Sequence, residues 1–432
     1  MYTTQGQLIH SLSFLSNAAF DIKADNFPKL QDDTTAIVTQ TLKDAGVQGD
    51  IGKWDLLWGP IVFSNDRTSK TVVADNTMML VYNAEQNLFV VAIAGTNAVS
   101  TYGFFQEDFG VNNLIDWNVV VPDADKKSGS IAAGTKQGLD ILLGMTGPEL
   151  MIEGTPTGDM VTALSDYMAY LKKQNASFTA TNVAVTGHSL GGALAPVMAL
   201  YLQDDTSWNK SGVATTISAW PTAGPTPGNK EFADYAGGRM KGNYNSFYNP
   251  IDVIPQAWAK ESLQNVPTLY KDGIPAPESS APFYTPIGTL VAGASLDSIN
   301  VLVDYFAPIS YTQIAPWQQL EGAAFFPGAE TLLNRYFDLV TSAMSHSGTN
   351  DYFDYLKCLL RFLKQMLYQH TKAYNTLLDI DDFMNRFSEI KKRILNTASE
   401  DLDEDAFFTA MKKYYGLPDL RAIAANAEAT VA

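Results

Sequence analysis

The 432-residue chain contains a single cysteine, Cys358. One cysteine excludes an intrachain disulfide and any metal cluster held by several thiolates. Cys358 lies among apolar residues with helical spacing, so we expect it to be a packed core residue. Walker, dinucleotide-binding, HExxH and EF-hand patterns are lacking as well. The sequence therefore gives no sign of a cofactor or a metal.

Long apolar runs and excess positive charge are also lacking. No window of about 20 apolar residues occurs, so we expect no membrane-spanning helix. The start, Met1 to Gln5, has neither the basic nor the apolar part of a signal peptide, which favours a cytoplasmic protein, export by another route, or a processed form. Lys and Arg number 29 against 46 Asp and Glu, a net charge of −17. This dispersed acidic charge argues against nucleic acid and against electrostatic docking on anionic membranes.

What is present is a chain with 46% hydrophobic residues, enough for a substantial core. Residues 1–60 are mostly helical in period and should pack on that core. Residues 61–256 alternate strands and helices, beginning with a hairpin of Thr71–Tyr82 and Asn87–Ala94, which indicates an α/β core with a sheet covered on both sides. Residues 257–350, rich in Pro, Ala, Ser, Gly and aromatics, predict an insertion, a candidate lid or cap. Residues 351–432 return to a helical period and should complete the core.

The most informative segment runs from Val183 to Gly192. A β-branched strand leads into Gly187-His188-Ser189-Leu190-Gly191, and an Ala-rich helix follows. Gly-x-Ser-x-Gly alone is a weak signal, because an ordinary Gly-rich turn before a helix has the same pattern. In the order strand, turn, helix it predicts a nucleophile elbow, in which Ser189 is exposed above the sheet at a helix N-terminus.

A nucleophilic serine needs a general base, and the chain has only four histidines. His188 adjoins Ser189, so its ring must point away from the hydroxyl and is expected to be structural or to line the pocket. His10 precedes the sheet on the polar side of a predicted helix and is expected to be exposed. His346 and His370 both follow the serine, as the order Ser, acid, His requires. Each also has a non-catalytic alternative: His346 could be a solvated loop residue, and His370 could be a helix C-cap residue.

The orienting acid and the oxyanion donors can also be proposed from position. Asp252, in Asn249-Pro250-Ile251-Asp252-Val253-Ile254-Pro255, follows a predicted strand and is flanked by prolines that would hold it rigid. An ordinary Asp in a Pro-bounded turn is equally compatible with these residues. The N–H of Leu190 and that of Thr96, after the apolar strand ending at Ala94, are the expected oxyanion donors.

Taken together, four segments in this order resemble the class 3 lipases, the fungal-type triacylglycerol lipase family of α/β hydrolases. The matching segments are Val90–Thr96, Thr186–Ala195, Pro225–Ala233 and Asn249–Pro255. The segment Gln369-His370-Thr371-Lys372-Ala373-Tyr374 is most similar to the family's His followed closely by Tyr, which favours His370 over His346. Ala94 departs from the family, which usually has Arg there.

This resemblance implies an α/β-hydrolase fold, with a central, mostly parallel sheet, a cap-like or lid-like insertion, and a Ser189–His370–Asp252 triad. The expected reaction is hydrolysis of a carboxylic ester of a lipid through an acyl-enzyme, by a triacylglycerol lipase or carboxylesterase. A phospholipase or a feruloyl-type esterase would use the same triad, and a catalytically silent lipid-binding module is a third reading. The expected partner is a lipid or another apolar acyl ester. Contact of the protein with a lipid interface is compatible with this expectation. The oligomeric state is left unspecified.

Overall fold

The computed structural model describes residues 4–97, 111, 113–147, 158–266, 269, 310–322, 365–366 and 368–396. The chain divides into two compact units. The first comprises Met1–Tyr248, Ile309–Leu320 and Asn375–Ala398, and the second comprises Asn249–Pro308, Glu321–Tyr374 and Ser399–Ala432. The boundaries predicted at residues 60, 256 and 350 remain predictions, and most of the predicted insertion lies outside the described residues.

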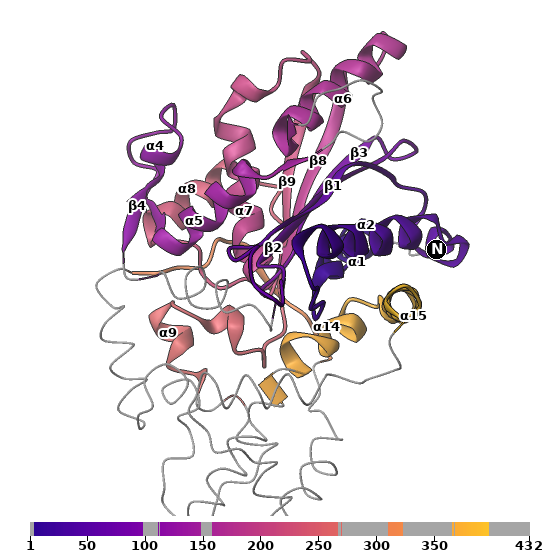
Figure 1. Cartoon of the computed structure of the whole chain (residues 1–432). Helices are drawn as coiled ribbons and strands as arrows, with labels where there is room; N and C mark the ends of the chain where they lie inside the picture. Colours follow the sequence, from indigo (N-terminus) through magenta and orange to yellow (C-terminus); the bar gives the residue numbers. More distant parts are fainter. Residues whose placement is uncertain are drawn as a thin grey trace, which may run out of the picture. The chain divides into compact units, whose positions relative to one another are not determined.

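Within the described residues, the first unit is built on a seven-stranded sheet (Figure 1). In spatial order its strands are β1 (Asp55–Phe63), β2 (Asn76–Asn83), β3 (Leu88–Ile93), β8 (Ala180–His188), β9 (Ala214–Thr222), β10 (Ser246–Tyr248) and β11 (Trp317–Gln319). β2 is antiparallel to both of its neighbours, β1 and β3, and β3, β8, β9, β10 and β11 run parallel to one another. The prediction of a mostly parallel sheet is confirmed.

The β2–β3 hairpin has the predicted turn, since Asn83 pairs with Leu88 across it. β3 is buried along its whole length between β2 and β8, which explains why its sequence is apolar on both faces. β11 was not predicted, and it comes from residues 257–350. It therefore shows that part of the segment predicted as an insertion extends the sheet.

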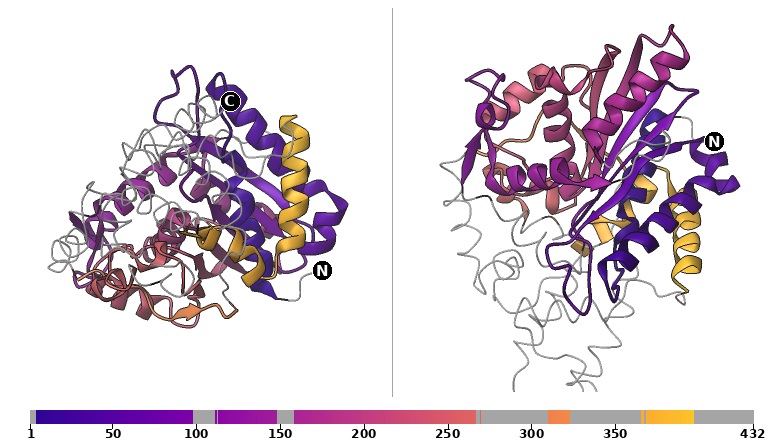
Figure 2. Two further views of the ribbon diagram at one scale, coloured as in Figure 1. Left: turned by 90° about the horizontal axis from the view of Figure 1, so that it is seen from below. Right: turned by 45° about the horizontal axis from the view of Figure 1, so that its top comes forward.

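Alternate residues of the central strands point into two separate cores. Phe89, Val91 and Ile93 belong to one, and Val90 and Ala92 belong to the other. The first core is closed by α5 (Ala133–Gly144), α6 (Met160–Gln174), α7 (Leu190–Asp204) and α8 (Lys230–Arg239). The second is closed by α1 (Gln5–Leu15), α2 (Phe27–Lys43), α3 (Ala45–Ile51) and α15 (Asp381–Leu395). The first unit is thus a helix–sheet–helix sandwich, as the two views of Figure 2 show, and the predicted α/β-hydrolase architecture is confirmed.

Short elements complete the described structure. In the first unit they are η1 (Ser16–Ala19), β4 (Leu114–Asp116), α4 (Trp117–Val120), β5 (Ser130–Ala132), β6 (Thr146–Gly147), β7 (Gly158–Asp159) and η3 (Thr206–Trp208). The second unit contains η4 (Ile254–Gln256) and α9 (Lys260–Leu263), and α14 (Lys372–Leu377) begins in it.

The prediction that His10 is exposed is wrong, because its side chain is buried at 1% exposure. α1 packs on β3, β8 and β9 and also touches α3 and α15, so its polar side is covered as well. The Trp220 and Phe247 rings form T-shaped pairs with the imidazole at centroid distances of 6.2 and 5.5 Å. This burial lowers the pKa of His10 from 6.5 to about 3.

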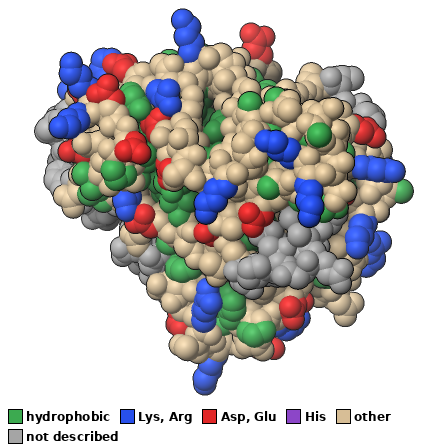
Figure 3. Space-filling view, turned by 90° about the horizontal axis from the view of Figure 1, so that it is seen from above, with side chains coloured by type: hydrophobic (Ala, Val, Ile, Leu, Met, Phe, Trp, Pro, Cys, Tyr) green, Lys and Arg blue, Asp and Glu red, His purple; other side chains and the backbone are tan. Residues whose placement is uncertain are grey.

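On the face shown in Figure 3, acidic and basic side chains are interspersed, with small apolar areas between them. Of the helices in the described ranges, none combines the length and the apolar character that crossing a membrane requires.

Candidate active site

Ser189 forms the turn between β8, which ends at His188, and α7, which begins at Leu190. Its backbone has φ 61° and ψ −123°, a strained conformation for a residue with a side chain. The Ser189 N–H donates to the carbonyl of Thr222 at 3.1 Å, and its own carbonyl accepts from Ala193 N–H at 3.0 Å. The end of β9 and the first turn of α7 therefore hold the serine in this conformation.

The turn has this shape because α7 starts in close contact with the backbone of β9. A Cβ added at Gly192 would overlap the carbonyl oxygen of Thr222 and would also lie 2.9 Å from Gly224 Cα. Only glycine lets the helix begin so close to the strand. The helix N-terminus, with its positive dipole end, is thereby fixed at Ser189, and the N–H of Leu190 belongs to its first turn.

The loop after β3 reaches the same turn. A Cβ on Gly95 would lie 2.7 Å from the His188 carbonyl oxygen and 3.2 Å from Ser189 Cβ, so this backbone touches the elbow directly. Thr96 is the next residue. Within the first unit, the structure thus places Ser189 and Leu190 in one turn and packs the residue before Thr96 against that turn.

His188 has the environment predicted for it. Its side chain is 4% exposed, its Nδ1 lies 3.0 Å from the Thr222 hydroxyl, and its ring lies 4.9 Å from that of Phe14. The imidazole is thus packed beneath the elbow, against β9 and α1, which agrees with a structural or pocket-lining residue.

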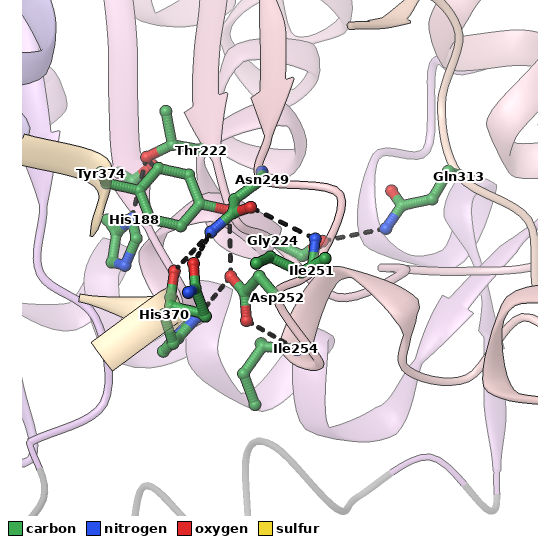
Figure 4. A network of polar contacts seen from close by, with 12 residues as sticks. His188, Thr222, Gly224, Asn249, Ile251, Asp252, Ile254, Gln313, His370 and Tyr374 are labelled. Carbon is green, nitrogen blue, oxygen red and sulfur yellow. Dashed lines mark hydrogen bonds and ion pairs between the residues drawn. The ribbon is translucent and has the colours of Figure 1, made fainter. Parts of the chain in front are cut away.

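In the second unit, the structure pairs Asp252 with His370 (Figure 4). Asp252 Oδ2 lies 2.8 Å from His370 Nδ1, and the two side chains are 0% and 13% exposed. An ionised carboxylate can only accept, so Nδ1 carries the hydrogen of this bond. In that tautomer Nε2 carries no hydrogen. Oδ1 of Asp252 accepts from the Ile254 N–H at 3.0 Å, which fixes the carboxylate plane.

A buried polar shell holds this pair, and our sequence reasoning did not predict it. The Tyr374 hydroxyl donates to Asp252 Oδ2 at 2.9 Å and accepts from the Asn249 N–H at 2.9 Å. The Asn249 amide donates to the carbonyl and to the side-chain oxygen of Gln369 at 3.0 and 2.7 Å. Asn249, Gln369 and Tyr374 are all fully buried. The signal in the sequence was the spacing of four residues between His370 and Tyr374, which lie on either side of the turn residue Thr371.

The remaining predicted residues can be placed only in part. His346 and Cys358 lie outside the described residues. The turn at Ser189 and the loop that carries Thr96 belong to the first unit, whereas the Asp252–His370 pair belongs to the second. Over the described ranges, no cluster of three His, Cys, Asp or Glu side chains is arranged to hold a metal ion.

This geometry agrees with a comparison with known families. Residues 112–261 match the model of the class 3 lipases. This matched segment is called the class 3 lipase region below. The class 3 lipase region contains Ser189, Leu190 and Asp252, whereas Thr96 and His370 lie outside it. The family supports a carboxylic ester hydrolase.

Solved structures extend the comparison beyond the class 3 lipase region. M37 lipase is similar over 91% of this chain and 98% of its own, with 24% sequence identity and a TM-score of 0.62, which shows a common fold. A lipase from Rhizopus microsporus var. chinensis covers 59% of this chain and 70% of its own, at 17% identity and a TM-score of 0.34. Lipase II from Rhizopus niveus covers 60% and 78%, at 18% identity and a TM-score of 0.36. No curated protein sequence matches the chain.

Proposed function

We propose that the protein is a serine hydrolase that cleaves carboxylic esters of lipids through an acyl-enzyme. The observation that carries the proposal is the strained turn at Ser189, against which the backbone of Gly95 is packed. The close approach of a serine at a helix N-terminus to the loop after β3 supports nucleophilic chemistry at this turn. The class 3 lipase region supports the same chemistry.

In the proposed reaction, the Ser189 hydroxyl attacks the ester carbonyl and His370 Nε2 takes its proton. The C–O bond then breaks, and the imidazolium gives the proton to the leaving alcohol. Water then attacks the acyl-serine while His370 takes its proton. The carboxylic acid leaves, and the proton returns to the Ser189 oxygen. Asp252 holds the ring in the required tautomer and stabilises its positive charge. The N–H groups of Leu190 and Thr96 stabilise the oxyanion.

The chain order supports joining these residues in one site. β8, β9 and β10 are parallel neighbours, so their carboxyl ends lie at one edge of the sheet. Ser189 directly follows β8, and Asp252 comes shortly after Tyr248, the last residue of β10. The covalent connection therefore starts the acid loop from the edge that carries the elbow, as the proposal requires.

A test of the proposal is hydrolysis of p-nitrophenyl esters of increasing acyl length. Ser189→Ala, His370→Ala and Asp252→Asn should each lose activity by several orders of magnitude, because a triad acts as a unit. His346→Ala is the matched control and should retain activity. Full activity of Ser189→Ala would refute the proposal, and loss in His346→Ala with full activity in His370→Ala would reassign the base.

The same assay separates the substrate classes. A preference for long acyl chains favours a lipase and one for short chains favours a carboxylesterase. Turnover of a phospholipid or of a feruloyl ester in its place would indicate one of the alternative hydrolases. The absence of turnover for every ester would favour a catalytically silent lipid-binding module.

A further inference from the structure

The loop that carries Thr96 is held from the N-terminal part of the chain. Asn17, in the short helix η1, accepts a hydrogen bond through Oδ1 from the Gly95 N–H at 3.0 Å. The residue before Thr96 is therefore tied to a segment 78 positions earlier in the sequence. The preceding N–H, that of Ala94, donates to the Thr77 carbonyl at 2.9 Å, which continues the pairing with β2 up to the loop.

The residue after Thr96 is held as well. Asn97 is 1% exposed, and its Nδ2 donates to the Ala74 carbonyl at 3.0 Å. Its Oδ1 accepts from the Asp21 N–H at 3.4 Å. Thr96 therefore lies between Gly95, whose N–H is held by the Asn17 side chain, and Asn97, whose own side chain is hydrogen-bonded to the backbone of Ala74 and Asp21.

The N-terminal turn that supplies these contacts is itself anchored. Asn17 has φ −78° and ψ 17°, which interrupts the helical geometry, and its carbonyl accepts from the Phe20 N–H at 2.9 Å. The Phe20 carbonyl accepts from Lys391 Nζ on α15 at 2.6 Å. α15, η1 and the loop that carries Thr96 are thus linked by hydrogen bonds within the first unit.

We infer that Asn17 and Asn97 are positioning residues that fix the direction of the Thr96 N–H for the developing oxyanion. This inference rests on the proposed function, since it assigns a purpose to rigidity beside the elbow. Oxyanion donors stabilise the transition state because they are aimed in advance at the charge that forms. Ordering this loop should therefore raise kcat and leave the KM for the ester nearly unchanged.

The two asparagines should respond differently to the same substitution. Asn17 acts on Gly95 only as an acceptor, so Asn17→Asp keeps the hydrogen bond and Asn17→Leu removes it at similar volume. Asn97 must also donate to the Ala74 carbonyl, so Asn97→Asp places an oxygen against an oxygen. We expect Asn17→Leu and Asn97→Asp to lose about 10- to 100-fold in kcat, below or near the cost of removing one donor. Asn17→Asp should stay within about threefold of the wild type.

Affinity for an alkyl trifluoromethyl ketone is a second readout, because its serine adduct carries the oxyanion. Its Ki should rise in parallel with the loss of kcat/KM, which a loss of overall stability alone would not produce. Asn83→Leu is the matched control. Asn83 Oδ1 accepts from the Gln86 N–H at 2.9 Å in the turn at the other end of β3. It should lower Tm similarly and leave kcat and Ki unchanged.

Wild-type kcat and Ki in Asn17→Leu would overturn the inference, and so would an equal loss of kcat in Asn83→Leu. If Asn17→Leu does not fold, Asn17→Asp and Asn97→Asp decide the matter, since equal kcat values in these two contradict it. Ser189→Ala in the same assay tests the proposed function separately. Its inactivity alongside an unaffected Asn17→Leu would refute the positioning role alone, whereas its full activity would refute the hydrolase mechanism.

Discussion

The buried His10 makes the stability of this protein depend on pH in a way that one substitution can remove. Within the described residues, neither nitrogen of its imidazole has a hydrogen-bond partner, and the ring forms T-shaped pairs with Trp220 and Phe247. His10→Phe keeps a flat ring in this site and removes both the titration and the unpaired polar atoms. At neutral pH we expect it to be at least as stable as the wild type, because an unsatisfied buried polar group costs about 1–3 kcal/mol.

The magnitude follows from the two pKa values of His10. Burial lowers the folded-state pKa to about 3, against 6.5 in the unfolded chain. Below pH 6.5 the unfolded chain therefore binds the extra proton, so the stability is fully present above that pH and is lost as the pH falls toward 3. Each pH unit in this range costs about 1.4 kcal/mol. We expect a loss of about 1.4 kcal/mol at pH 5.5 relative to pH 7.5.

Urea unfolding followed by tryptophan fluorescence at pH 7.5 and pH 5.5 measures this loss. Both conditions lie above the sequence pI of about 4.6, where a protein with no net charge tends to precipitate. The decisive quantity is the difference between His10→Phe and the wild type at each pH, because the other titrating groups cancel. If that difference is the same at both pH values, His10 is not a buried neutral group and the packing of α1 described above is wrong.

Two further predictions concern the site and the elbow. Tyr374→Phe removes a donor to Asp252 and leaves the buried Asn249 N–H unpaired. It should lower the free energy of unfolding by about 1–3 kcal/mol, which denaturation measures. It should also reduce kcat less than Asp252→Asn does, which ester kinetics measure. Gly192→Ala puts a methyl group into the Thr222 carbonyl and should abolish or severely destabilise the fold. The control is Gly144→Ala in α5, where an added Cβ meets nothing within 4 Å. It should leave the stability in thermal unfolding unchanged or raise it by up to about 1 kcal/mol. An equal loss of stability in both variants would contradict the close approach of α7 to β9.

The parts of the fold that the sequence predicted are those with strong local signals. The β2–β3 hairpin, the apolar strand β3 and the turn at Ser189 each depend on neighbours within a few residues. The pairing of Asp252 with His370 spans 118 positions, and only the order of the motifs and the family resemblance pointed to it. β11 had no such signal, because three residues are too few to show a strand period.

The environment of polar residues could not be predicted. α1 is buried on nearly all sides, so the helical period that marks one apolar face does not tell where His10 lies. Asn17 and Asn97 resemble ordinary turn residues in sequence, since Asn is common wherever the chain bends. Their partners are distant in sequence. Only the folded chain shows that the Asn17 amide accepts from the Gly95 N–H and that the Asn97 amide bonds to Ala74 and Asp21.

The central claim is that Ser189 is a nucleophile activated by His370, and covalent labelling tests it most directly. An alkyl fluorophosphonate loses fluoride to an activated serine and leaves a stable adduct, which peptide mass spectrometry locates. We expect one adduct per chain on Ser189, strongly slowed in His370→Ala and unchanged in His346→Ala. An adduct on another residue, or unmodified Ser189 in protein that still hydrolyses esters, would contradict this account.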